Sequence, residues 1–371
     1  MPLIDLSWQH RQVESLIQDG VAELFRTQQF ILGGPVRQFE EAIAAYIGCR
    51  HAIACASGTD ALLLSLMAAG IGPGDHVLTT PYSFFATASS IHRLGARPVF
   101  CDVDPRTFQL DTAKALELLA REQRIRAVLP VHLFGACMDL DPLQRACLER
   151  GIVLIEDAAQ AIGSSWNGRP AGSFGAMASW SFFPTKNLGA YGDAGMITTG
   201  DEALAERLAM LRVHGSRVRY LHEEVGINSR LDSLQAVILS AKLTRLEEWN
   251  EMRRGNAALY RRLLEPEGYP IRLPAPEAPA VRHTFHQFVI TCADREPLRA
   301  FLTGQGIATE VYYPTPLHLQ PCFAYLGYRP GDLPVSELLA TQALALPIYP
   351  GLSADDIAYV CHAIGRFYGA R

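Results

Sequence analysis

The sequence predicts an α/β fold: a large domain with a mostly parallel central sheet flanked by helices, and a smaller C-terminal α/β domain. Between residues 50 and 200, short apolar runs alternate with helix-length segments, with a strand about every 25 residues. Apolar residues follow one another without interruption in these runs, as expected for strands that helices cover on both faces. The alternation restarts after the proline-rich segment 265–280, which predicts the second domain.

The predicted elements follow in a regular order along the chain. In the large domain, we expect strands at residues 51–57, 76–80, 97–103, 126–131, 152–156, 178–183 and 195–199. The helices expected there span residues 59–69, 83–94, 111–121, 140–150 and a long stretch at 230–254. In the small domain, we expect strands at 286–292 and near 308–312, and helices at 295–305 and 354–368. The predicted domains are therefore 1–250 and 251–371.

Composition indicates a globular protein and argues against several classes of function. Of the 371 residues, 49% are hydrophobic and 19% are charged. A net charge of −5 gives no basic surface of the kind that nucleic-acid binding requires. The eight cysteines form no C-x-x-C pair, so we expect no metal site. Without a recognisable signal sequence or membrane span, a cytoplasmic protein is the expectation.

Lysine-dependent chemistry has three candidates, because the sequence contains only Lys114, Lys186 and Lys242. Lys114 and Lys242 fall in helix-like segments, where lysines are usually solvated. Lys186 instead follows an apolar strand and lies among phenylalanine, proline and glycine. Partial burial there would lower its pKa and make the neutral amine available for Schiff-base formation. A surface lysine whose stem covers apolar side chains is an equally open alternative.

Two other segments stand at strand ends, where open α/β sheets gather ligands. Ser57-Gly58-Thr59 opens a helix, and a helix N-terminus suits a phosphate group, although an ordinary N-cap explains the pattern better when it is taken alone. Residues 81–85 contain aromatic side chains that could stack on a flat ring or pack in the core.

An acidic pair, Glu156-Asp157, follows the apolar run 152–155. An acid at the end of a buried strand is costly unless it is paired. In a site for pyridoxal 5′-phosphate (PLP) the partner is the ring nitrogen, which the carboxylate keeps protonated. A metal ligand, an N-cap or a surface acid are the alternatives. Gln160 is close enough in sequence to reach the ring hydroxyl from the same side of a turn.

The order and spacing of these motifs resemble the DegT/DnrJ/EryC1/StrS sugar aminotransferases, a branch of the fold type I PLP enzymes, whose fold is like that of aspartate aminotransferase. The similarity runs from about Ile4 to the last helix. It rests on the segments 30–36, 57–62, 74–77, 84–88, 98–104, 131–135, 156–161, 181–189, 226–232 and 346–351.

The resemblance implies a role for each matching residue. Lys186 would form the Schiff base with PLP, and Asp157 would pair with the ring nitrogen. The other cofactor contacts implied are Gln160 at the ring hydroxyl, Phe84 on the ring face, Gly58, Thr59 and Ser181 at the phosphate, and Asn228 at the phosphate of the neighbouring subunit's cofactor. A homodimer with shared active sites would follow. Tyr313 and His318 would lie near the sugar, and the loop 30–34 would border it across the dimer.

The family also implies the reaction. Glutamate or glutamine would give its amino group to PLP, leaving pyridoxamine 5′-phosphate, which would aminate a keto sugar linked to a nucleotide. The run Gly192-Asp193-Ala194-Gly195 resembles members that act at C3. Arg217, Arg219 and Arg230 could bind the diphosphate or a donor carboxylate, or be solvated surface charges.

Three alternatives stay open. They are a cyclitol (keto-inositol) aminotransferase, a PLP enzyme of the same fold with lyase or desulfurase chemistry, and a non-catalytic PLP-binding regulator. Dehydratases of the family replace the lysine with histidine, and Lys186 argues against that variant.

Overall fold

The computed structural model describes residues 1–275 and 280–369, and its centre is a seven-stranded sheet with the order β1-β9-β8-β5-β4-β2-β3. The strands are β1 His51–Cys55, β2 His76–Thr79, β3 Arg97–Phe100, β4 Ile125–Leu129, β5 Val153–Asp157, β8 Met177–Ser181 and β9 Gly195–Thr199. The pairs from β3 to β8 are parallel, and β9 runs antiparallel to both β8 and β1. The predicted α/β fold with a mostly parallel sheet is confirmed.

Helices cover both faces of this sheet. They are α2 Gly34–Ile47, α3 Gly58–Ala68, α4 Ala86–Arg93, α5 Thr112–Arg121, α6 Asp141–Arg150, α7 Glu202–Leu211 and α8 Ser233–Leu243. Neighbouring residues of one strand enter different cores: Ile155 packs with α3, α4 and α7, whereas Leu154 packs with α2, α5, α6 and α8. Because side chains alternate across a strand, uninterrupted apolar runs serve both cores, and this alternation explains the sequence pattern.

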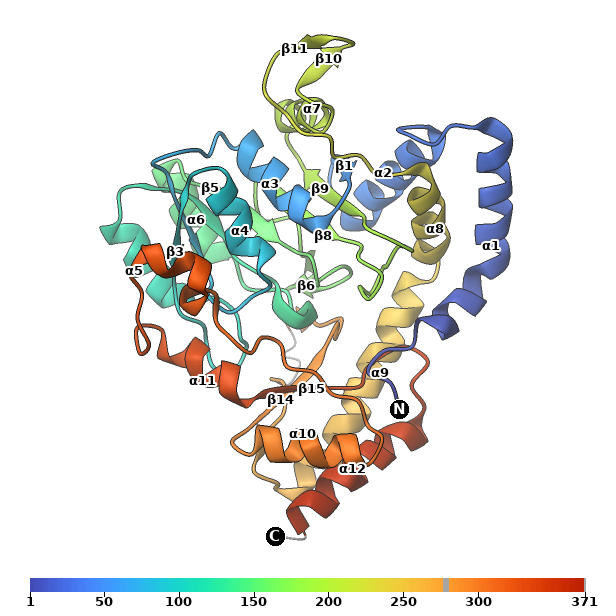
Figure 1. The fold of residues 1–371 in the computed structure, drawn as a ribbon, viewed down its shortest axis with the longest axis vertical. Coiled ribbons are helices and arrows are strands. Elements are labelled where there is room, and N and C mark those ends of the chain that lie inside the picture. The colour runs from blue at the N-terminus through green and yellow to red at the C-terminus, as the bar shows by residue number, and fades with distance from the viewer. Residues whose placement is uncertain (276–279, 370–371) are drawn as a thin grey trace.

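Two segments, helix α1 and a short hairpin, extend beyond this layered body (Figure 1). Helix α1, Leu6–Thr27, packs along α8 at one side of the molecule. A short hairpin of β10 Ser216–Val218 and β11 Leu221–His222 projects past the end of α7. Large apolar side chains on it are exposed, with Tyr220 80% and Val225 91% accessible.

The C-terminal part has its own sheet and core. Strands β12 Ile271–Arg272, β14 Phe288–Cys292 and β15 Ala343–Leu346 are antiparallel. Helices α9 Leu246–Leu264, α10 Arg295–Gly304, α11 Pro334–Gln342 and α12 Ala354–Gly369 accompany them. A hydrophobic cluster formed by α9, α10, α12, β14 and β15 is the core of this part, distinct from the clusters around the central sheet. The division at residue 250 stays a prediction, since α9 runs across that position.

Short elements complete the described chain. They are β6 Ser165–Trp166, β7 Arg169–Pro170 and β13 Val281–Arg282 in a small sheet, and the 3₁₀ turns Leu133–Gly135, Glu265–Glu267, Leu317–Leu319 and Pro321–Leu326. Residues 276–279 of the proline-rich segment lie outside the described residues. Within 1–275 and 280–369, no helix combines the length and hydropathy needed to cross a membrane. The cytoplasmic location stays a prediction.

Two sequence expectations about elements are wrong. The single long helix expected at 230–254 is two helices. Helix α8 ends just before Thr244, and α9 begins two residues after it. The Thr244 hydroxyl donates to the Ala241 carbonyl at 2.7 Å, and the Arg245 N–H donates to the Lys242 carbonyl in a tightened last turn. The start of α9 shares a core with α8, and from Ala257 onward α9 packs in the C-terminal core. The strand near 308–312 is reduced to a single bridge between Glu310 and Ala345.

Candidate active site

The N-terminus of α3 lies against the end of β8. A Cβ atom at Gly58 would lie 2.6 Å from Ser181 Cβ, so only glycine allows the helix start to approach this closely. Ser57 Oγ accepts a hydrogen bond from the Asp60 N–H at 3.1 Å and caps the helix. The capping interpretation is therefore correct, and it leaves other N–H groups of the first turn beside Ser181 and the half-buried Thr59.

Asp157 ends β5 with its carboxylate held by two donors. Thr87 Oγ1 donates to Oδ2 at 2.8 Å, and the Ala159 N–H donates to Oδ1 at 3.2 Å. The side chain is buried, and this burial raises the pKa of the Asp157 carboxyl above its usual range. A nearby cation would offset that cost of burial. Lys186 and His132 are the charged or chargeable groups close enough to lower the Asp157 pKa in part.

Gln160, Tyr313 and Phe84 lie together although they are far apart in sequence. Gln160 Oε1 accepts from the Phe134 N–H at 2.7 Å, and its Nε2 donates to the Tyr313 hydroxyl at 3.2 Å. The Phe84 ring lies 6.3 Å from that of Tyr313 between ring centroids. Phe84 is 58% exposed, so one face of a large apolar ring is available for stacking.

Lys186 stands in the loop after β8, half-buried. Burial lowers the pKa of its amine to about 8, and the Asp157 carboxylate opposes this change. The predicted partial burial of Lys186 is therefore present in the structure, and it favours a desolvated amine over a surface lysine whose stem alone is covered. An amine with this pKa is partly neutral near physiological pH and is a better nucleophile than an ordinary lysine.

We predict a distinct pH profile for amine modification in protein freed of cofactor. The rate at Lys186 should rise up to about pH 8 and then level off, because its pKa is about 8. An ordinary lysine, with pKa about 10.4, should keep gaining reactivity for about two further pH units. Reductive methylation followed by peptide mass spectrometry measures both. A profile at Lys186 that is still rising at pH 10 would contradict the lowered pKa.

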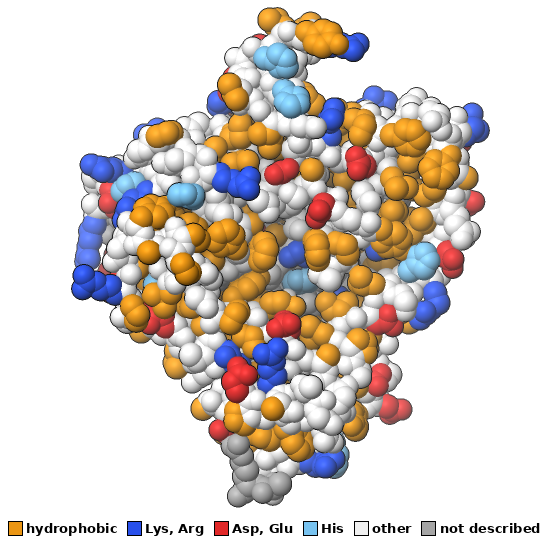
Figure 2. Space-filling view, viewed as in Figure 1, with side chains coloured by type: hydrophobic (Ala, Val, Ile, Leu, Met, Phe, Trp, Pro, Cys, Tyr) orange, Lys and Arg blue, Asp and Glu red, His pale blue; other side chains and the backbone are white. Residues whose placement is uncertain are grey.

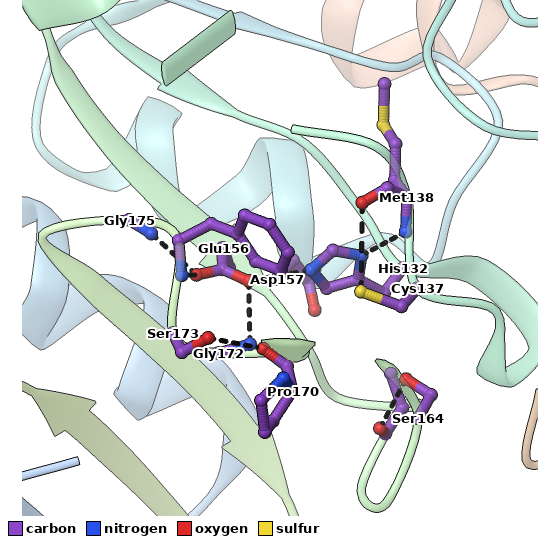
Figure 3. Close-up of polar contacts among 12 residues, drawn as sticks. His132, Cys137, Met138, Glu156, Asp157, Ser164, Pro170, Gly172, Ser173 and Gly175 are labelled. Carbon is purple, nitrogen blue, oxygen red and sulfur yellow. Dashed lines mark hydrogen bonds and ion pairs between the residues drawn. The ribbon is translucent and has the colours of Figure 1, made fainter. Parts of the chain in front are cut away.

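Glu156 is the neighbour of Asp157 on β5, and its side chain lies on the opposite face of the sheet from that of Asp157. It is fully buried (Figure 3). His132 Nδ1 accepts from the Met138 N–H at 3.0 Å, so His132 Nε2 carries the hydrogen that lies toward Glu156 Oε2 at 2.8 Å. Three further donors to this carboxylate are the N–H groups of Gly172, Phe174 and Gly175, each at 2.7 Å. Glu156 thus ties β5 to the loop before β8, and these partners could not be predicted from the pattern of neighbouring residues.

Replacing Glu156 with glutamine should destabilise the fold. The amide would place its own N–H₂ group against backbone N–H donors, and the free energy of unfolding should fall by about 2–3 kcal/mol. Denaturant unfolding of the purified variant measures the change. Glu149→Gln, at an exposed position of α6, is the matched control and should stay within about 0.5 kcal/mol of the parent protein. Equal stability of the two variants would refute the anchoring role.

Three other groups of predicted residues lie outside these contacts. His318 is buried, with Nε2 3.1 Å from Glu337 Oε1 and its ring packed beside Phe100. Asn228 is exposed and bridges to Val213 near the base of the hairpin. On the hairpin, the guanidinium of Arg219 lies over Tyr220, and Arg217 lies 3.8 Å from two glutamates. Arg230 is half-buried. The roles assigned to these residues stay predictions.

The expectation that Lys242 is solvated is wrong. Its side chain is 3% exposed, and Nζ donates to the Gly189 carbonyl at 2.6 Å, just beyond Lys186. Lys242 lies on the inner side of α8, where helical periodicity alone would have predicted an apolar residue. Lys114, by contrast, is 49% exposed as expected.

These groups fit the parts of PLP. The helix start and hydroxyls around Gly58 suit a phosphate, the free face of Phe84 suits a ring, and the buried Asp157 carboxylate suits a protonated ring nitrogen. The partly neutral Lys186 amine suits an aldehyde carbon. Figure 2 shows the molecular face hollowed near its middle, over the region of β8 and β6, with basic and histidine side chains among hydrophobic ones.

Comparison with known proteins agrees with this chemistry. The DegT/DnrJ/EryC1/StrS aminotransferase family model matches residues 11–365. A "Pleiotropic regulatory protein" of Geobacillus stearothermophilus is 48% identical over 368 residues, covering 99% of this chain and 98% of that protein. A UDP-N-acetyl-3-dehydro-alpha-D-glucosamine 3-aminotransferase of Acidithiobacillus ferrooxidans is 42% identical over 367 residues, covering 99% and 97%.

A solved structure is also similar over the whole chain. The crystal structure of S. venezuelae DesV in complex with a ketimine intermediate superposes with a TM-score of 0.95 at 38% identity, covering 99% of this chain and 98% of the other. The match extends over the central sheet and the C-terminal part alike. This chain therefore belongs to the DegT/DnrJ/EryC1/StrS aminotransferase family and is a PLP-dependent aminotransferase.

Proposed function

We propose that this enzyme transfers an amino group from glutamate or glutamine to the C3 keto carbon of a nucleotide-linked sugar. The observation that carries the proposal is a partly neutral Lys186 amine near the buried Asp157 carboxylate, which ends the central strand β5. The 42% identical relative, named for amination of a 3-dehydro sugar on UDP, supports both the substrate class and the carbon. The run 192–195 supports the same position.

In this proposal, each side chain has a separate task. The Lys186 amine would hold PLP, and as a free amine it would move a proton at the substrate carbon. PLP supplies the electron sink. Asp157 keeps the ring nitrogen protonated, and Thr87 holds the Asp157 carboxylate in place through its 2.8 Å hydrogen bond. Gln160 contacts the ring hydroxyl.

The remaining cofactor contacts position the ring. Gly58, Thr59 and Ser181 bind the phosphate at the start of α3, where backbone N–H groups favour an anion. Phe84 stacks on the ring face with its exposed side. Tyr313, whose hydroxyl accepts from Gln160, borders the sugar together with His318.

The proposed enzyme is a homodimer with shared sites. Asn228 reaches the phosphate of the cofactor in the second copy, and the loop 30–34 borders the sugar there. Support comes from the hairpin, where Val218, Tyr220, Leu221 and Val225 are all at least 59% exposed. Large apolar groups gathered on a projecting element favour cover by another protein surface.

A spectrum tests the function. Protein loaded with PLP should absorb at about 410–430 nm, and glutamate should move the band to about 330 nm. A 3-keto nucleotide sugar should then restore the first band, while the 4-keto isomer and keto-inositol serve as matched controls. Restoration by keto-inositol alone would show a cyclitol aminotransferase. A band that neither glutamate nor glutamine changes would show a regulator without turnover.

A further inference from the structure

Building on the proposed role of Lys186, we propose that Lys242 is a positioning residue for it. Its ammonium group, on α8, contacts the loop 183–192 from the buried side of that loop. This contact fixes the position of the backbone from which the Lys186 side chain extends. Lys242 touches neither substrate nor cofactor in this proposal. Its effect passes through Gly189 and Tyr191.

The contacts of Lys242 are unusual for a lysine. Nζ donates to the Gly189 carbonyl at 2.6 Å and lies 4.2 Å from the centroid of the Tyr191 ring. With 3% of the side chain exposed, the charge has lost most of its hydration. A buried ammonium is costly, and one carbonyl with one aromatic face recovers only part of that cost. A leucine would fill the same helix position without this cost, so stability of the fold is a poor reason for a lysine here.

The same helix makes a second contact with the loop. Gln235, two turns before Lys242 on α8, accepts the Tyr191 N–H through its Oε1 at 2.8 Å. Helix α8 therefore holds adjoining parts of the loop, the carbonyl of residue 189 and the amide of residue 191. Both contacts come from side chains on a rigid element, which holds a loop more precisely than another loop can.

The opposite side of the loop is fixed by a different set of groups. Asn187, next to Lys186, donates from Nδ2 to Asn250 Oδ1 at 2.8 Å and to the Thr284 carbonyl at 3.1 Å. Its Oδ1 lies 3.1 Å from His286 Nδ1. The two donations identify Nδ2 and so leave Oδ1, which can only accept, facing the histidine. His286 Nδ1 is therefore the donor in this contact. The residue after Lys186 is thus anchored from α9 and the C-terminal part.

The loop between these anchors has little freedom of its own. The Lys186 N–H donates to the Phe183 carbonyl and the Ala190 N–H to the Phe182 carbonyl, both at 2.8 Å. A Cβ at Gly189 would lie 2.2 Å from the Pro184 carbonyl oxygen, so the chain folds back tightly on itself there. Releasing the Gly189 carbonyl would loosen the turn that carries Lys186. Small errors in the placement of a reacting amine reduce catalysis strongly.

The test compares Lys242→Met, which keeps an unbranched apolar stem and removes the ammonium group, with Lys114→Met at the exposed lysine. In the PLP-loaded enzyme, hydrogen exchange at the Ala190 and Tyr191 amides should become about tenfold faster in Lys242→Met. The pH at which the visible band of bound PLP is half converted should shift as well, because this pH depends on protonation of the Lys186 nitrogen that joins the cofactor. Lys114→Met should change neither reading.

A second variant covers the case in which Lys242→Met does not fold. Gln235→Leu removes the other contact from α8 and should also speed exchange at the Tyr191 amide about tenfold. Unchanged exchange in the loop together with an unchanged spectral midpoint, in whichever variant folds, would overturn the proposal. These readings need only bound PLP, so they stand apart from the identity of the sugar, which the keto-sugar panel tests.

Discussion

Replacing Lys186 with alanine should lower the rate of amino transfer by on the order of 10³-fold or more. Under the proposed mechanism, the variant loses both the amine that would attach the cofactor and the group that would move the proton. Because Lys186 is half-buried in a loop, the fold should survive the change. Steady-state turnover with glutamate and a 3-keto nucleotide sugar measures the loss.

The matched control for this experiment is Lys114→Ala, which removes an exposed lysine and should leave turnover within about twofold of the parent enzyme. Ethylamine added to Lys186→Ala should restore part of the rate, since a free amine can take over proton transfer. If Lys186→Ala keeps full turnover, the assignment of Lys186 is wrong, and the remaining lysines would have to be tested in turn.

Asp157→Asn should reduce turnover by on the order of 10²–10³-fold. The amide has nearly the same shape, and its oxygen can still accept the Thr87 hydroxyl, so the geometry of β5 should persist. What is lost is the negative charge that, in the proposed mechanism, keeps the ring nitrogen of PLP protonated. Turnover and the affinity for PLP, measured by absorbance titration, separate the loss of chemistry from the loss of binding.

Asp355→Asn is a suitable control, because Asp355 lies exposed in the first turn of α12, far along the chain from the sheet. Its turnover should match the parent enzyme within a factor of two. Turnover of Asp157→Asn within tenfold of the parent would show that another group holds the ring nitrogen. Thr87→Val should have a smaller effect than Asp157→Asn, because it removes only one support of the carboxylate.

The central sheet could be predicted because its strands carry a strong local signal. Uninterrupted apolar runs such as 152–155 are typical of strands buried on both faces, and the acid that follows stands where the strand leaves the core. The start of α3 at Gly58 was also predictable, because a serine cap and a glycine precede a long apolar run. These features depend on neighbours in the sequence.

What could not be predicted depends on contacts between distant residues. No periodicity reveals that Glu156 meets His132 and three backbone amides, or that Lys242 reaches Gly189, because each partner comes from another element. The break between α8 and α9 was not predicted either, because the apolar pattern of 230–254 is helical throughout. Leu246 of α9 still packs in the core that α8 contacts, and α9 enters the C-terminal core only from Ala257 onward.

The scarcity of lysine has a practical consequence for anyone attaching a probe to this enzyme. If PLP is bound at Lys186 as proposed, the only lysine side chain left open to an amine-reactive dye is Lys114, on the outer side of α5, because Lys242 is enclosed. Apart from the N-terminal amine, labelling should therefore give a single, defined site. Coupling through Lys114 would orient every molecule on a surface in the same way.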